Sequence, residues 1–153
     1  MPVNAISPNG VASPQTIVGA AKVAITDSGS EVVIGALVFD GGAIPAGQAA
    51  LFEFLGVATD PDTASVGSVR LYDLGPADGP EVAPVLRATL TIDTSTADDG
   101  KVLRKSVQLV PSASPGGAPQ IYNTPRLYQV RGHRSASGGS ETFSVFRASI
   151  AVS

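Results

Sequence analysis

The segment from Glu141 to Val152 reads ETFSVFRASIAV, and its side chains alternate in character along its length. Successive side chains of a β-strand point to opposite faces, so a period of two indicates a strand with one buried face. The two halves of the pattern are Phe146, Ala148, Ile150 and Val152 on one side, and Val145, Arg147, Ser149 and Ala151 on the other. The chain is therefore expected to end in a β-strand that belongs to a sheet.

Working outward from this segment, seven more stretches have the composition of short strands. The stretch Gln48–Ala58 would also suit a short helix, because Ala49 and Ala50 precede a closing Gly56, but the alternating phenylalanines favour a strand. About eight antiparallel strands predict an all-β domain, a two-sheet sandwich with a jelly roll as the leading topology. The other strand candidates are Thr16–Ile25, Glu31–Phe39, Ser68–Leu74, Pro84–Asp93, Lys101–Val110 and Gln120–Arg131. The expected core includes Leu90, Ile92, Val107, Leu109, Phe146 and Ile150.

Turn residues separate these stretches at short intervals, since the chain has 17 glycines and 12 prolines. The turn Asp27–Ser30 predicts a hairpin between the first two strands. Asp98-Asp99-Gly100 predicts a second hairpin, because Asp-Gly between alternating segments is a strong hairpin signal. The stretch Gly75–Pro80 predicts a loop.

The length of 153 residues corresponds to one domain with a sizeable core. Met1 to Gln15 is rich in proline and small residues, so we expect an extended N-terminal arm over residues 1–15 and a single β-sandwich domain over residues 16–153. Two interpretations of the arm remain open: a frayed terminus, or a segment that docks on a neighbouring molecule.

Charge is sparse: 15% of residues are charged, against about 25% in an average domain. Charged residues are depleted in the centres of protein interfaces, so this composition favours a protein that works within an assembly. The net charge of −3 gives no basic footprint for nucleic acid. We expect no signal peptide, no membrane span and synthesis in the cytoplasm, because no basic region precedes an apolar run and no apolar stretch approaches ~20 residues.

Candidates for chemistry are few. The chain has no cysteine, and its single histidine, His133, lies in a loop-like stretch without a nucleophile motif beside it. The pairs Asp60/Asp62 and Asp98/Asp99 lack the spacing of a calcium loop. Nothing in the sequence pairs any two of the strand-borne glutamates into a glycosidase site, these being Glu31, Glu53 and Glu141. We predict no catalytic residue, no metal site and no cofactor.

The remaining patterns also favour structural roles. Gly116-Gly117 and Gly138-Gly139 lack the lysine and the helix that phosphate binding needs, so both predict connectors. Sugar-binding sandwiches present aromatic platforms, but tryptophan is absent here and only three tyrosines are present. Of these, Tyr72 and Tyr128 are expected to pack in the core or between the sheets, and Tyr122 is the third.

The arm Met1–Gln15, the segment Ser68–Leu74 and the closing strand Phe143–Val152 together resemble small β-sandwich virion proteins of tailed bacteriophages. These are the capsid decoration (cement) and head-fibre proteins. The resemblance implies a homotrimer or similar symmetric unit that binds a larger lattice, such as that of a major capsid protein, and a location in the virion. It implies no catalytic residues.

Two principal hypotheses follow. The first is a non-enzymatic structural subunit in the sense of a capsid decoration (cement) protein. Such a protein would bind other copies of itself and a larger capsid lattice, and would stabilise that lattice. The alternative is a receptor- or carbohydrate-binding β-sandwich module of a virion or cell-surface protein, for which an aromatic-lined groove would be the sign. An enzyme is the least favoured class.

Overall fold

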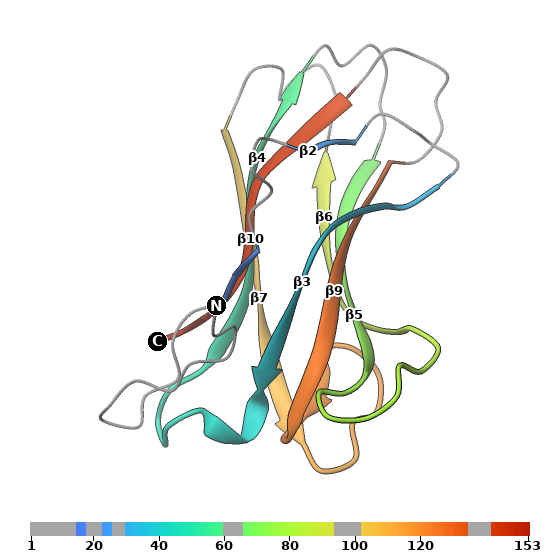
Figure 1. The fold of residues 1–153 in the computed structure, drawn as a ribbon. Coiled ribbons are helices and arrows are strands. Elements are labelled where there is room, and N and C mark those ends of the chain that lie inside the picture. The colour runs from blue at the N-terminus through green and yellow to red at the C-terminus, as the bar shows by residue number, and fades with distance from the viewer. Residues whose placement is uncertain (1–14, 18–22, 26–29, 60–65, 94–101, 135–141) are drawn as a thin grey trace.

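The computed structural model describes residues 15–17, 23–25, 30–59, 66–93, 102–134 and 142–153. Its elements are ten strands and one 3-10 turn, η1, arranged as two facing layers (Figure 1). They are β1 (Gln15–Ile17), β2 (Val23–Ile25), β3 (Val32–Asp40), η1 (Gly41–Ala43), β4 (Ala50–Thr59), β5 (Val66–Pro76), β6 (Val85–Asp93), β7 (Val102–Ser112), β8 (Gln120–Tyr122), β9 (Pro125–Arg134) and β10 (Thr142–Val152). The all-β sandwich predicted from the sequence is confirmed.

The strands form two sheets with the orders β1-β10-β4-β7-β8, in which β2 also pairs with β10, and β3-β9-β5-β6. Four antiparallel pairings nest inside one another along the chain: β5 with β6, β4 with β7, β3 with β9, and β1 and β2 with β10. A long antiparallel hairpin folded over on itself produces this nesting, which is the jelly-roll arrangement. The predicted topology is therefore confirmed.

The first predicted hairpin is wrong. The candidate strand Thr16–Ile25 corresponds to β1 and β2, which lie one after the other along the edge of β10. The following strand, β3, pairs with β9 in the opposite sheet. A turn signal indicates that the chain changes direction, but it does not say whether the next strand stays in the same sheet. Residues 26–29 of the expected turn lie outside the described residues.

The hairpin predicted at Asp98-Asp99-Gly100 is wrong for the same reason. Its two arms, β6 and β7, belong to different sheets, where β6 pairs with β5 and β7 pairs with β4. The turn residues themselves are not among those described. The innermost hairpin is instead formed by β5 and β6, around the loop that the sequence places at Gly75–Pro80. Gly75 has a φ of +119°, a conformation that glycine adopts without strain.

The closing strand β10 departs from strict alternation at one position. Its register with β4 shifts between Val145 and Arg147, so one extra residue forms a β-bulge. Beyond the bulge, Ala148 and Ile150 pack in the core cluster as predicted, but Val145 packs there as well. The expectation that Val145 faces away from the core is wrong, because an inserted residue exchanges the two faces of the strand before it.

The other strand assignments fit the sequence closely. The ambiguous stretch Gln48–Ala58 forms the strand β4 rather than a helix. The candidate Gln120–Arg131 is divided into β8 and β9, and Pro125 begins the second of them. No helix within the described part of the chain is long and apolar enough to cross a membrane.

The core lies between the two sheets and is built from aliphatic and aromatic side chains of both. Leu90, Leu109 and Ile150 are buried as predicted, and Val107 is half-buried against the same cluster. The side chains of Ile92 and Phe146 lie outside the described set, so their burial stays a prediction. The largest fully buried side chains are Tyr128, Phe39, Phe52, Phe54, Leu71, Leu109, Ile121 and Ile150.

Candidate interaction surface

The structure describes three of the sequence-predicted candidates for chemistry, Glu31, Glu53 and His133. His133 is half-buried on β9, and its backbone register partner is Ser68 of β5. Glu53 lies on β4 and pairs in register with Ser106 and Ser149. The pairs Asp60/Asp62 and Asp98/Asp99, and also Glu141, fall outside the described residues. Within the part of the chain that is described, no group of three acidic, histidine or cysteine residues could hold a metal ion.

The outer face of the β3-β9-β5-β6 sheet carries a polar cluster centred on Glu31. The Tyr72 hydroxyl donates a hydrogen bond of 2.6 Å to Glu31 Oε2, and Arg70 Nη1 donates one of 3.3 Å to the same oxygen. Arg131 Nη1 lies 3.5 Å from Glu31 Oε1, and its guanidinium stacks on the Tyr72 ring at 4.6 Å. The cluster therefore connects the start of β3 to β5 and β9.

These contacts shift the ionisation of both acids in the cluster. Partial burial by itself raises the pKa of Glu31, but the hydrogen bonds from Tyr72 and Arg70 and the charges of Arg70 and Arg131 outweigh it, so the pKa lies below 4.5. Burial and the hydrogen bond to Glu31 raise the pKa of Tyr72 above 10.0. The prediction that Tyr72 packs in the core or between the sheets is wrong, because its hydroxyl is bound to Glu31 on the outer face. Glu31 lies 41 residues away in the sequence, so the pattern around Tyr72 does not predict this contact.

A second charged cluster closes the end of the sandwich where β5 meets β6. Asp73 is only 1% exposed, and both of its carboxylate oxygens accept from Arg126 Nε at 3.1 Å. The Gly75 amide donates to Asp73 Oδ1 at 2.8 Å, and Arg87 Nε lies 3.9 Å from Asp73 Oδ2. Arg87 also donates from Nη1 to the Gly116 carbonyl at 2.9 Å. We call these residues, Asp73, Arg87 and Arg126, the Asp73 cluster.

Two tyrosines complete the Asp73 cluster. Tyr122 on β8 has the Arg126 guanidinium over its ring at 4.0 Å and that of Arg87 at 5.5 Å, a cation–π geometry. Tyr128 is fully buried, as predicted, and burial raises the pKa of its hydroxyl. The cluster thus joins β5, β6, β8, β9 and the loop around Gly116 at one end of the fold.

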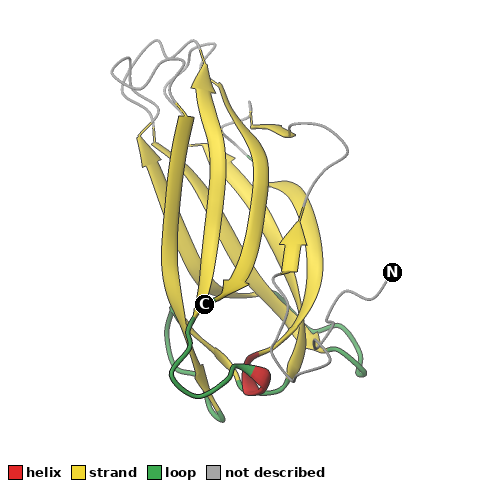
Figure 2. Ribbon diagram, turned by 90° about the vertical axis from the view of Figure 1, so that its left-hand side faces the viewer, coloured by secondary structure: helices red, strands yellow, loops and turns green. Residues whose placement is uncertain are grey.

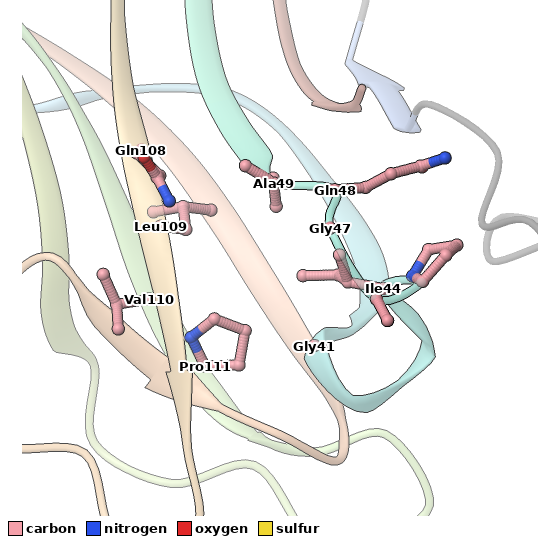
Figure 3. A pocket seen from close by; sticks show the side chains of 12 residues that line it. Gly41, Ile44, Gly47, Gln48, Ala49, Gln108, Leu109, Val110 and Pro111 are labelled. Carbon is pink, nitrogen blue, oxygen red and sulfur yellow. The ribbon is translucent and has the colours of Figure 1, made fainter.

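A shallow cavity of about 330 Å³ lies at the same end, between the β3–β4 connection and the end of β7. Figure 3 shows Val110 and Pro111 of β7 on one side of it and Ile44 on the other. Its lining residues include Gln48 and Gln108 but neither an ionisable nor an aromatic side chain. The lining of the cavity therefore offers no acid, base or nucleophile.

Exposed apolar side chains gather beside this end, around the start of β6. Val82, Val85 and Leu86 are 43%, 44% and 41% exposed. The Val82 amide donates to the Leu74 carbonyl at 2.7 Å, which holds the β5–β6 loop against β5. Figure 2 shows the sandwich from the side, with η1 and the described loops at its lower end. The sequence pattern does not predict this exposed apolar surface, because which valine and leucine side chains stay exposed depends on how the strands pack.

Comparison with known proteins was informative at the level of structure alone. No protein-family model matches the chain, and no curated protein is similar to it in sequence. A chain in the structure of infectious bursal disease virus, Gt strain, aligns over 99% of this chain with a TM-score of 0.53 and 17% identity. A chain of the Gx strain aligns over 99% with a TM-score of 0.53 and 14% identity.

What is shared is the fold. A chain of T=1 particles derived from infectious bursal virus aligns in the same way, over 99% of this chain, with a TM-score of 0.51 and 16% identity. This chain spans only 36–37% of the length of those chains. The jelly roll described above is therefore also found as part of larger viral chains, at 14–17% sequence identity.

Proposed function

We propose that this chain is a non-enzymatic structural subunit of a virion. The observation that carries the proposal is the alignment of nearly the whole jelly roll with chains of virus particles. The sparse charge of the chain and the exposed apolar side chains around β6 support it, because both suit a surface that another subunit covers.

The finer form of the proposal is a capsid decoration (cement) protein of a tailed bacteriophage. In this role the chain forms a symmetric homo-oligomer, with a trimer preferred, and binds the lattice of a larger capsid protein. The arm of residues 1–15 contributes contacts outside its own domain, which comprises residues 16–153. A receptor- or carbohydrate-binding module is less well supported, because the residues lining the cavity include no aromatic side chain on which a sugar ring could stack.

The experiment compares the full chain with a variant that lacks residues 1–14, so that Gln15 and the rest of β1 are retained. Mass is measured by size exclusion with light scattering, and concentrated samples are imaged by electron microscopy. The full chain should form symmetric oligomers. The deletion should weaken assembly while leaving the melting temperature nearly unchanged. A monodisperse monomer whose deletion variant differs only in solubility would contradict the proposal.

A further inference from the structure

The cavity between the β3–β4 connection and the end of β7 has an uncharged lining. It combines apolar side chains, among them Ile44 and Val110, with the side-chain amides of Gln48 and Gln108 (Figure 3). Val110 is 46% exposed, so part of this lining faces solvent. Apolar walls with a few neutral hydrogen-bonding groups suit an uncharged ligand, and amides both donate to and accept from peptide groups. The cavity is therefore suited to an uncharged segment of polypeptide.

Residues 1–14 of this chain are such a segment. They contain no charged side chain, and the first charged residue of the chain is Lys22. Three prolines lie among them, and their apolar side chains include Val3, Ile6 and Val11. Proline reduces the conformational freedom that a segment loses when it binds. A charged surface would lose solvation against this arm without gaining an opposite charge, so an uncharged surface is its better partner.

The arm joins the domain at the same end of the sheet as the cavity. Gln15, the first residue of β1, pairs with Ile150, and Val152 pairs with Ala50, which lines the cavity. Because β1 and β10 are antiparallel, the chain enters β1 from the end of the sheet at which Val152 lies. A stretch of 14 residues spans at most about 50 Å when fully extended, which is enough to reach a neighbouring molecule.

The arm and the cavity lie toward opposite edges of that sheet. In the order β1-β10-β4-β7-β8 the arm precedes the first strand, whereas the cavity lies beside the ends of β4 and β7. Two different surfaces on opposite edges of a subunit meet when copies stand side by side in the same orientation. Such head-to-tail contacts close into a ring when the rotation between copies permits it, and a trimer is a ring of this kind.

We propose that residues 1–14 of one copy bind the cavity beside β7 of the neighbouring copy in a symmetric oligomer. The inference rests on the proposed function, in which the arm makes contacts outside its own domain, and it names the surface that receives the arm. The apolar side chains of the arm cover Ile44 and Val110 of the neighbour. Each copy gives one arm and receives one, so every contact around the ring is the same.

The first test is disulfide crosslinking, which has no background because the chain contains no cysteine. Val110→Cys is combined in the full chain with Val3→Cys, Ile6→Cys or Val11→Cys, and the oxidised products are separated on non-reducing gels. A disulfide needs Cα atoms within about 7 Å, so at least one pair should form an interchain bond and give dimers and larger species. The matched control replaces Val110→Cys with Val33→Cys, which is 53% exposed on β3 of the other sheet and should give none.

The second test places a charge in the cavity. Val110→Glu should raise the dissociation constant of the oligomer by the same factor as deletion of residues 1–14, measured by light scattering over a dilution series. Combining the two changes should have no further effect, because each removes the same contact. Val33→Glu is the control and should leave the dissociation constant unchanged. Circular dichroism checks that every variant is folded.

The outcomes separate this inference from the proposed function. If only intrachain disulfides form, the arm binds its own cavity and the inference is wrong, although the structural role stands. The same holds if the wild type assembles while Val110→Glu assembles equally well, or if its effect adds to that of the deletion. A wild type that stays monomeric at every concentration overturns both.

Discussion

Replacing Asp73 with alanine should destabilise the fold by about 3–5 kcal/mol, the cost of leaving buried cations without their partner. Asp73 is 1% exposed, and the side chains of Arg87 and Arg126 are only 7% and 15% exposed. In Asp73→Ala both guanidinium groups stay in a place where water cannot solvate them well, and the Gly75 amide loses its acceptor. This loss is a large part of the roughly 5–15 kcal/mol by which a domain is stable.

The assay is urea unfolding followed by far-ultraviolet circular dichroism, because the chain contains no tryptophan for fluorescence. Asp73→Asn is the milder variant, since its amide oxygen can still accept from Gly75, and it should fall between wild type and Asp73→Ala. The matched control is Asp78→Ala, which removes an exposed carboxylate of the β5–β6 loop. A surface substitution of this kind usually changes stability by no more than about 0.5 kcal/mol.

The stability of the Asp73→Ala variant tests whether the Asp73 cluster stabilises the fold. If Asp73→Ala costs less than about 1 kcal/mol, no more than an exposed pair, then the cluster does not stabilise this end of the sandwich. Adding Arg126→Met to Asp73→Ala should recover part of the loss, because it removes one of the two unpaired cations. No recovery would place the cost in the Gly75 turn instead.

Two further predictions concern the core and the outer face. Ile150→Ala, at a fully buried site, should lower the free energy of unfolding in urea by about 2–5 kcal/mol. Val102→Ala, at a site 71% exposed, should change it by less than about 0.5 kcal/mol. Similar values for the two variants would show that the core is misassigned. The folded state lowers the pKa of Glu31 below its ordinary value of 4.5. Its carboxylate therefore stabilises the fold at any pH above 4.5, and this contribution is lost as the pH falls through the folded pKa. Glu31→Gln should therefore be less stable than wild type at about pH 7 and approach it at about pH 3, as followed by thermal melting; a constant difference across that range would argue against the ion pairs with Arg70 and Arg131.

The sequence by itself determined the class of the fold. Alternation in segments such as Gln48–Ala58 and Pro84–Asp93 is a local property, because one face of each strand must be apolar wherever that strand is placed in the sandwich. The same local pattern identified Leu90, Leu109 and Ile150 as core residues. It failed at Val145, because a β-bulge depends on the partner strand and leaves no trace in the alternation of one strand.

Only the tertiary structure decided which strands pair and where the charged side chains lie. Turn residues such as Asp98-Asp99-Gly100 reverse the chain, but the choice between pairing with the previous strand and crossing to the other sheet depends on how the whole nested hairpin packs. The clusters around Asp73 and Glu31 bring together residues far apart in sequence, as the bond between Asp73 and Arg126 does. The burial of Arg87, whose side chain is 7% exposed, follows from that meeting. Sequence patterns report what a residue prefers locally, whereas the burial of a charged side chain depends on the residues that the fold brings to it.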